Sequence, residues 1–282
     1  MKITEILKKK RTFSFEFFPP KDEKQSSDFF ENLKELALLN PDFVSVTDTN
    51  YGIAKYKHLA LSKLLMEKLN FNVILHLTCI NNTRKELIEF LNKAIEFKIE
   101  NILALRGDYS FSCDINARDF SYAIDLLPII NKDFFSIGAA AHPESHPESS
   151  GLDEDIEFMK RKIDAGVSFF ITQVVFDNEA LYRFMEKMRK NNINAPLIVG
   201  IMPVSNYKMI ENIEKKTGHI SKPKEFLHIV ENYKDKKEEF YKYSLDFFTA
   251  QCEDLLSKGV NALHFFTFNK AKMPKEILKR LK

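Results

Sequence analysis

A single carboxylic acid stands in an otherwise apolar run near the amino terminus, SFEFFPP at residues 14–20. Aromatic and polar residues alternate through this run, which predicts a strand with Glu16 on the face opposite to the apolar one. Pro19 and Pro20 cannot extend a sheet ladder, so the strand should end just after Glu16. Apolar neighbours can raise the pKa of a glutamate toward roughly 6–7, where it can serve as a general acid. The alternative is a solvated glutamate on an edge strand.

Polar side chains recur at the ends of the apolar runs that follow. Barrel enzymes build their active sites at the carboxyl ends of strands, and barrel interiors are otherwise filled with apolar side chains. These polar groups therefore predict one shared active site, although they do not by themselves identify the reaction. The candidates are Glu16, Thr47, Asp48, His76, Thr78, Arg106, Asp108, His142, Glu144, Gln173, Thr267 and Asn269.

Three charged motifs allow more than one interpretation. The Arg-Gly-Asp run at 106–108 could hold a local ion pair that only shapes a turn. The HPESHPE run at 142–148 carries two histidines four residues apart. Pro143 and Pro147 preclude the helix that would place both on one face, so we expect no metal site there. The basic run at 160–162 could neutralise a pyrophosphate or form an ordinary surface patch.

Short apolar runs alternate with longer helical patterns along almost the whole chain. Amphipathic patterns predict helices at 28–39, 56–69 and 154–164, and Gly166 is placed to end the third. Residues 83–86 have the sequence of a capping box. The charged run 231–239 predicts a solvated helix face. The predicted strands are residues 12–17, 42–47, 73–78, 101–106, 135–141, 168–175, 196–202 and 261–267.

The alternation of strands and helices predicts the fold class. Strands separated by helices pair in parallel through right-handed crossovers. Eight such units in about 250 residues match a closed α/β barrel, the (β/α)₈ TIM barrel, and we expect a single domain over residues 1–282. A doubly wound open sheet is the alternative. It usually carries a GxGxxG turn after its first strand, and none of the eight glycines forms one.

Composition excludes several classes of protein. A hydrophobic content of 44% with 29% charged residues is ordinary for a globular protein, and a net charge of +2 gives no reason to expect nucleic-acid or membrane binding. The apolar run after the basic residues 8–11 is too short for a signal peptide or membrane span. Three distant cysteines without a CxxC pair favour a reducing, cytoplasmic location over disulfides or zinc.

Taken together, these motifs resemble the methylenetetrahydrofolate reductases, flavoproteins built on a (β/α)₈ barrel. The resemblance covers nearly the whole chain, in order and with compatible spacing. It implies a catalytic barrel of the bacterial type, without the regulatory domain of eukaryotic members. It is carried by SFEFFPP (14–20), FVSVT (43–47), HLTCI (76–80), ALRGD (104–108), HPESHPE (142–148), RKIDAG (161–166), ITQ (171–173), MPVSN (202–206) and HFFT (264–267).

The resemblance implies a specific reaction. NADH or NADPH would reduce a tightly bound FAD and leave, and 5,10-methylenetetrahydrofolate would then take the hydride and become 5-methyltetrahydrofolate in a ping-pong sequence. The cofactor carries the redox chemistry while the protein supplies position and electrostatics. The methylene bridge must be protonated before it opens to an iminium, which is the step that suits Glu16.

The resemblance also implies roles for individual residues. Glu16 and Asp108 match the catalytic carboxylates, and the folate-binding positions add Gln173, Tyr207 and Lys270. Arg161 and Lys162 suit the pyrophosphate. The positions that match FAD contacts are Thr47, His76, Arg106, Asp108, Tyr122, Ala123, His142, His146, Asp155, Arg161 and Lys162.

Three positions depart from the family pattern. Residues 48–52 replace an aromatic residue and a glycine-rich loop, His142 stands where Tyr is usual, and Lys270 stands where Arg is common. Two other functions remain open: a metal-dependent barrel lyase or hydrolase that uses Glu16, His76, Asp108 and His142, and a folate-binding module without redox chemistry. Relatives are commonly homo-oligomers, so we expect self-association.

Overall fold

Eight parallel strands close into a barrel in the computed structural model, which describes residues 1–48, 56–80, 82–107, 119–217 and 220–281. Each strand pairs with its neighbours in chain order, and β1 closes the ring against β8. The fold class and all eight predicted strands are confirmed, and the open doubly wound sheet is excluded. The strands are β1 (Thr12–Phe17), β2 (Phe43–Val46), β3 (Val73–Thr78), β4 (Asn101–Leu105), β5 (Ser136–Ala141), β6 (Phe169–Val174), β7 (Leu197–Ile201) and β8 (Ala262–Phe266).

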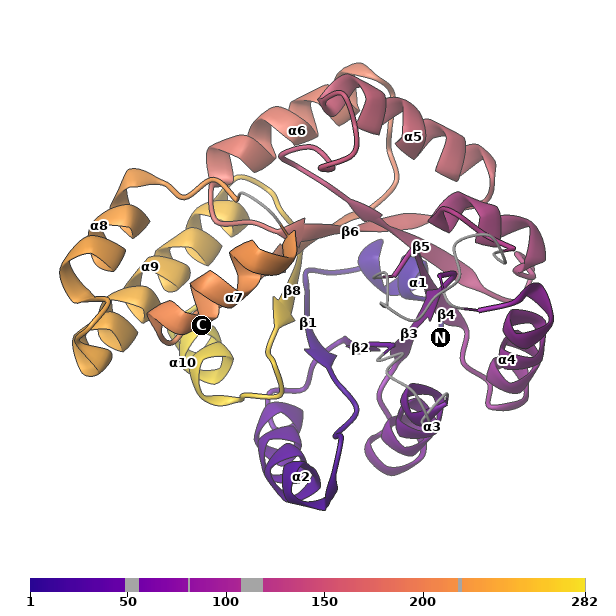
Figure 1. Ribbon diagram of the computed structural model, residues 1–282, viewed down its shortest axis with the longest axis horizontal. Helices are drawn as coiled ribbons and strands as arrows, with labels where there is room; N and C mark the ends of the chain where they lie inside the picture. The colour runs from indigo at the N-terminus through magenta and orange to yellow at the C-terminus, as the bar shows by residue number, and fades with distance from the viewer. Residues whose placement is uncertain (49–55, 81, 108–118, 218–219, 282) are drawn as a thin grey trace.

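Helices surround the barrel on its outer side (Figure 1). A 3₁₀ helix, η2 (Ala123–Ile129), follows β4, and no helix in the described part of the chain is long and apolar enough to cross a membrane. The α-helices are α1 (Ile3–Leu7), α2 (Glu23–Ala37), α3 (Lys57–Leu69), α4 (Arg84–Glu96), α5 (Leu152–Asp164), α6 (Asn178–Lys190), α7 (Tyr207–Thr217), α8 (Lys224–Tyr233), α9 (Lys237–Ser257) and α10 (Lys272–Arg280).

Local sequence signals set several helix ends. Thr83 and Glu86 form the predicted capping box, in which each side chain bonds to the other residue's backbone N–H. Gly166 has a φ of 108° just beyond α5 and ends that helix as predicted. The prediction for α2 began five residues late, because the helix is capped by Asp22, whose side chain accepts from the Gln25 N–H, and its first turn is wholly polar.

The charged run 231–239 is exposed, as predicted, but it is not one helix face. It spans the end of α8, a short turn and the start of α9. The turn follows Tyr233, and the Lys236 N–H bonds back to the Tyr233 carbonyl. Charge alone does not distinguish a continuous exposed helix from two helices joined by an exposed turn.

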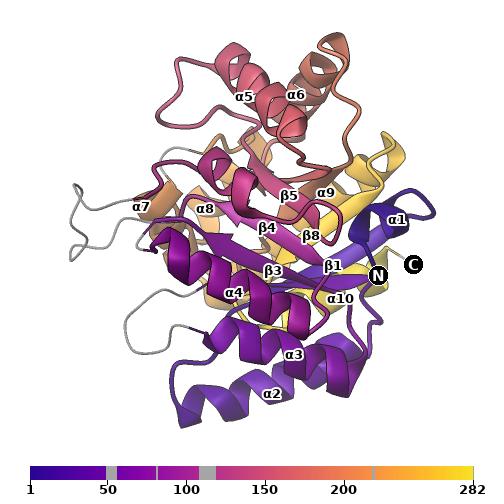
Figure 2. The same ribbon diagram turned by 90° about the vertical axis from the view of Figure 1, so that its right-hand side faces the viewer.

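The alternation along each strand produces two apolar layers. Phe15 and Phe17 face outward and belong to the large core between strands and helices. A smaller cluster inside the barrel includes Phe43, Ile74 and Phe169, and α1 adds Ile3 to it from the amino-terminal end. Figure 2 shows α1 and both chain termini at that end of the barrel, opposite to the carboxyl ends of the strands. The other end of the barrel is therefore the one left available for polar groups.

Candidate active site

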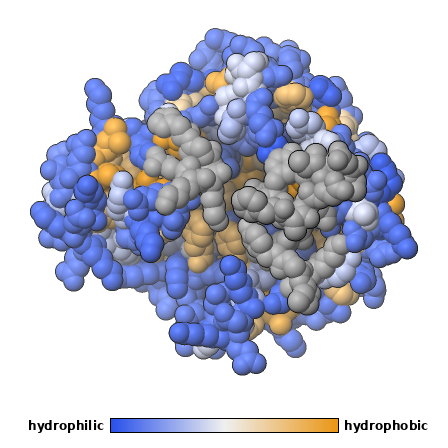
Figure 3. Space-filling view, viewed as in Figure 1, coloured by the Kyte–Doolittle hydropathy of each residue, from blue (hydrophilic) through white to orange (hydrophobic). Residues whose placement is uncertain are grey.

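The carboxyl ends of the strands form a mouth on the face that Figure 1 turns toward the viewer. In the space-filling view of this face, apolar residues are visible near the centre, with hydrophilic residues around them (Figure 3). Most of the residues predicted for an active site follow strands of the barrel and so come to this one end. Asp108 lies outside the described residues, as does most of the 48–52 loop.

Glu16 points into the barrel from the carboxyl end of β1. Its residue is only 7% exposed, whereas the alternating Phe15 and Phe17 are packed outside the barrel. Burial raises the pKa of Glu16 from 4.5 to about 8, so the carboxyl group is mostly protonated at neutral pH. The edge-strand interpretation is therefore wrong, because β1 pairs on both sides and encloses the carboxyl group.

His76 lies beside Glu16 and is also enclosed. The Glu16 Oε2 atom is 3.7 Å from His76 Nε2. Burial lowers the pKa of His76 to about 3, with smaller contributions from His264 and His58, so the imidazole is neutral. His76 Nε2 and Thr47 Oγ1 are two of the seven buried side-chain polar atoms that have no hydrogen-bond partner in the described part of the chain. Such atoms are rare in folded proteins, and two at one barrel mouth indicate a place for a polar ligand.

Arg106 reaches from the end of β4 to a carboxylate far along the chain. Its Nη1 lies 2.7 and 2.6 Å from the two carboxylate oxygens of Glu148. This contact holds the pKa of Glu148 below its usual value. Arg106 is thus paired with a residue of the loop after the neighbouring strand β5, and the local pair with Asp108 that the sequence allowed lies outside the described residues. No local sequence motif predicted that Glu148 would pair with Arg106, because 42 residues separate the two.

The loop after β5 brings the two histidines of the HPESHPE run together. It is not helical, as the prolines predicted, yet the rings of His142 and His146 meet edge to face with centroids 4.7 Å apart. Asp155 stabilises the loop, since its carboxylate accepts hydrogen bonds from the His146 N–H and the Ser149 hydroxyl. Across the described ranges, no three His, Cys, Asp or Glu side chains are placed to hold a metal ion.

The basic and aromatic residues predicted to contact the cofactor differ in their solvent exposure. Lys162 is partly buried, with its Nζ 3.5 Å from the Ala140 carbonyl, and burial lowers its pKa. Arg161 is exposed and lies over the Phe158 ring. Tyr122 is exposed and directly precedes η2, where Ala123 is the first residue.

The three candidates for folate contacts come from three different elements. Gln173 lies near the end of β6, at a register shift of the β6–β7 ladder, and its side-chain oxygen accepts from the Val174 N–H. Tyr207 begins α7 and packs partly against the outer core. Lys270 is exposed just after β8. The structure places these three at the carboxyl end of the barrel, on its β6, β7 and β8 side.

The model of the methylenetetrahydrofolate reductase family matches residues 2–282. The chain belongs to this family. It is 32% identical over 286 residues to Methylenetetrahydrofolate reductase (NADH) 1 of Arabidopsis thaliana, covering 95% of this chain and 48% of the relative. It is 34% identical over 270 residues to the 5,10-methylenetetrahydrofolate reductase of Buchnera aphidicola from Acyrthosiphon pisum, covering 92% of this chain and 87% of that protein. It therefore spans about half the length of the plant relatives and most of the Buchnera relative.

A solved structure agrees on the fold of this member of the methylenetetrahydrofolate reductase family. An uncharacterized Clostridium thermocellum protein that binds two copies of 5-methyl-5,6,7,8-tetrahydrofolic acid aligns with a TM-score of 0.68 over 99% of this chain and 97% of its own. The two sequences are 18% identical, so the similarity supports the barrel alone.

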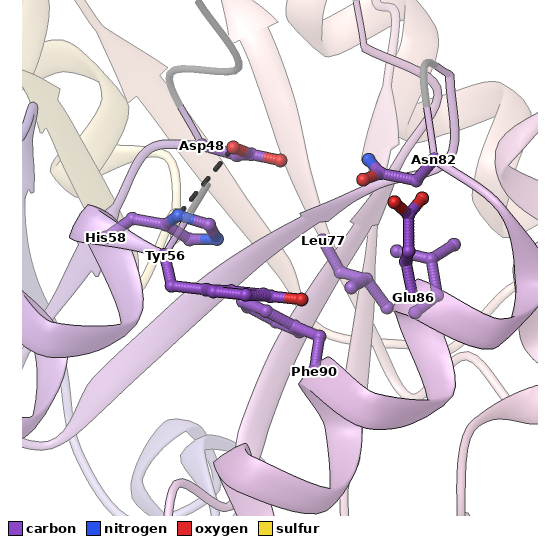
Figure 4. Close-up of a pocket in the computed structure, with 8 residues that line it drawn as sticks. Asp48, Tyr56, His58, Leu77, Asn82, Glu86 and Phe90 are labelled. Atoms are coloured by element: carbon purple, nitrogen blue, oxygen red, sulfur yellow. Dashed lines mark ion pairs between the residues drawn. The ribbon is translucent and has the colours of Figure 1, made fainter. Parts of the chain in front are cut away.

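The structure of this methylenetetrahydrofolate reductase family member also shows a small pocket that the sequence did not predict. Figure 4 shows Asp48 directed toward His58, with Tyr56 and Phe90 below them; the Asp48 and His58 side chains approach to 3.7 Å. The Thr78 hydroxyl donates to Asp48 from the barrel side. His58 stacks on Phe90, and burial lowers its pKa. His58 lies in a helix with no motif around it, so no sequence signal could have placed it here.

Proposed function

We propose that this protein reduces 5,10-methylenetetrahydrofolate to 5-methyltetrahydrofolate with electrons from NADH or NADPH, through bound FAD. The observation that carries the proposal is the burial of the Glu16 carboxyl group, which raises its pKa to about 8, at the barrel mouth of a chain from the methylenetetrahydrofolate reductase family. A reductase that only transferred a hydride would have no need for a proton donor there, whereas opening the methylene bridge needs one.

The residues at the mouth fit FAD. Thr47 Oγ1 and His76 Nε2 are buried polar atoms without partners in the described part of the chain, and a flavin offers polar ring atoms that could pair with them. Lys162 supplies positive charge near the end of β5, which suits a pyrophosphate, and Arg106 lies near the end of β4 with its charge paired to Glu148. The residues proposed to hold FAD are Thr47, His76, Arg106, Asp108, Tyr122, Ala123, His142, His146, Asp155, Arg161 and Lys162.

Bound FAD would supply the hydride chemistry, accepting a hydride from NAD(P)H and donating one to the one-carbon unit of folate. Glu16 would give its proton to the nitrogen of the methylene bridge, which opens the ring for reduction. Its raised pKa suits this role, because a carboxyl group that is ionised at neutral pH has no proton to give. His76 is neutral and therefore does not draw the proton of Glu16 into an ion pair.

Other side chains would orient the substrates. Gln173 offers an amide at the end of β6 that would bond to the pterin, and Asp108 would hold the pterin from the loop after β4. Tyr207 presents an aromatic ring that can stack on nicotinamide or pterin. A single mouth supports use by NAD(P)H and folate in turn, which is the basis for a ping-pong sequence. Lys270 is exposed and would meet the glutamate tail of folate.

The proposal is tested by product analysis. Purified protein supplied with FAD, NADH or NADPH, and methylenetetrahydrofolate under anaerobic conditions should form 5-methyltetrahydrofolate, identified by mass spectrometry. Omission of FAD from protein stripped of flavin should abolish the product. Breakdown of the folate without formation of the reduced product, stopped by a chelator and unaffected by flavin, would favour the metal-dependent lyase or hydrolase. Folate binding without any turnover would favour the non-redox folate module.

A further inference from the structure

The turn after β8 has an unusual backbone. Phe268 and Asn269 have φ values of 47° and 58°, so two consecutive residues other than glycine adopt the left-handed conformation. This region disfavours side chains, Asn tolerates it better than most residues, and a bulky aromatic residue does so rarely. Strained backbone of this kind persists only where surrounding contacts hold it, and such positions cluster at functional sites.

Asn269 uses this conformation to bond to both backbone groups of Phe18. Its side-chain oxygen accepts from the Phe18 N–H at 2.9 Å, and its side-chain nitrogen donates to the Phe18 carbonyl at 2.9 Å. The β1–β8 pairing ends at Glu16 and Phe266. The Asn269 amide therefore ties down the chain two residues beyond Glu16, where Pro19 and Pro20 prevent further ladder bonds.

Thr267 holds Glu16 itself. The Thr267 hydroxyl is buried, donates to the Glu16 carbonyl at 2.7 Å and accepts from the Asn269 N–H at 3.1 Å. The rings of Phe18 and Phe268 stack above this turn, with centroids 5.8 Å apart and planes within 4° of parallel. The backbone of β1 is thus fixed both at Glu16 and two residues after it by one three-residue turn.

We propose that Thr267 and Asn269 are positioning residues, which hold the Glu16 carboxyl group inside the barrel mouth so that it remains a proton donor. This inference deepens the proposed function and rests on it for the catalytic role of Glu16. The link is physical: the β1–β8 ladder ends at Glu16, so without the turn this end of β1 would be held on one side only, by its pairing with β2, and could shift toward solvent. A carboxyl group closer to water is more easily ionised.

The direct test is the titration of Glu16 in the protein alone. The carboxyl carbons of glutamate are labelled with ¹³C, and the Glu16 signal is assigned as the one that disappears in Glu16→Gln. Asn269→Gly removes the amide while glycine still accepts the left-handed turn. We expect its Glu16 titration midpoint to fall by about one pH unit or more relative to the parent. An unchanged midpoint in Asn269→Gly would overturn the inference.

A second pair of variants separates the hydroxyl from the shape of Thr267. Thr267→Val removes both hydrogen bonds with little change in volume, whereas Thr267→Ser keeps the hydroxyl. We expect Thr267→Val to lower the Glu16 titration midpoint and Thr267→Ser to keep the midpoint of the parent protein. The inference fails if Thr267→Val and Thr267→Ser give the same Glu16 titration midpoint. If Asn269→Gly does not fold, this comparison decides the question.

Asn101 provides a matched control at the opposite end of the barrel. Its side chain likewise bonds to backbone groups, accepting from the Ile3 N–H and donating to the Val73 carbonyl. Asn101→Ala should lower the unfolding temperature without moving the Glu16 titration. Equal movement of the titration in Asn101→Ala would show a general loosening and contradict the inference. Because the titration needs neither flavin nor folate, its outcome is independent of whether the parent protein forms 5-methyltetrahydrofolate.

Discussion

Glu16 and His76 lie 3.7 Å apart inside the barrel mouth and are both uncharged at neutral pH. Burial acts on the two groups in opposite directions, because it disfavours the charged form of each. The pKa of Glu16 rises to about 8 and that of His76 falls to about 3. An exposed pair of the same residues would tend to form an ion pair instead. The enclosed pair keeps the proton on the carboxyl group, where a proton donor is needed.

Glu16→Gln should separate the two halves of the proposed reaction. The amide keeps the size of the side chain but cannot donate an acidic proton. We expect flavin reduction by NAD(P)H to change by less than about twofold and folate reduction to slow by about 10²–10⁴-fold. Stopped-flow measurement of each half-reaction checks this. Glu157→Gln, at an exposed position on α5, is the matched control. An equal loss in both half-reactions would make Glu16 a structural residue.

The folate half-reaction should depend on pH with a single alkaline limb. Glu16 must be protonated to act as the acid, so the rate should be constant below its pKa and fall as the pH rises through about 8. Rapid-mixing measurements across this range give the profile. The limb should be missing from the residual rate of Glu16→Gln. A rate that increases with pH through the same range would contradict the assignment of Glu16 as acid.

The raised pKa of Glu16 also predicts a cost in stability. The folded protein holds the Glu16 proton more tightly than the unfolded chain does, so the protonated carboxyl group stabilises the fold. This stabilisation is fully present below pH 4.5 and is lost as the pH rises toward about 8. A pKa difference of this size corresponds to roughly 5 kcal/mol at most. Glu16→Gln cannot ionise and should gain stability over the parent between these pH values, as measured by urea denaturation. A constant difference at all pH values would show that Glu16 titrates normally.

Lys162 and Lys160 provide a matched pair for FAD binding. Lys162 is partly buried beside the Ala140 carbonyl at the end of β5, whereas Lys160 bonds to Glu157 and Asn191 on the outer side of α5. Lys162→Met should weaken FAD binding by about tenfold or more, because a positive charge near the pyrophosphate is lost. Lys160→Met should leave FAD affinity within about twofold. Fluorescence titration of flavin measures both. Equal effects would remove Lys162 from the proposed cofactor site.

The barrel was predictable because its signals are local. Each strand is a short apolar run, and prolines or glycines stand near several element ends, so the strand boundaries agree within a residue or two. The alternation also placed Glu16 on the face opposite to Phe15 and Phe17, and the structure shows that this face lines the inside of the barrel. The start of α2 was missed because its first turn is polar and carries no apolar periodicity.

The contacts of the site that could not be predicted from the sequence join segments that are far apart in the chain. Arg106 meets Glu148 across 42 residues, and Asn269 meets Phe18 across 251. No local spacing encodes such contacts, since they depend on how the barrel closes. The pKa of Glu16 lies further from its ordinary value than the sequence suggested, because β1 is paired on both sides and the enclosure is complete.

The most direct measurement is an anaerobic absorbance titration of the purified protein reconstituted with FAD. We predict that flavin bands appear with the protein, bleach on addition of NADH or NADPH, and return when methylenetetrahydrofolate is added. In Glu16→Gln the bleaching should remain and the return should be slow. A protein that does not bind FAD, or whose bleached flavin is not reoxidised by methylenetetrahydrofolate, would contradict the proposed function.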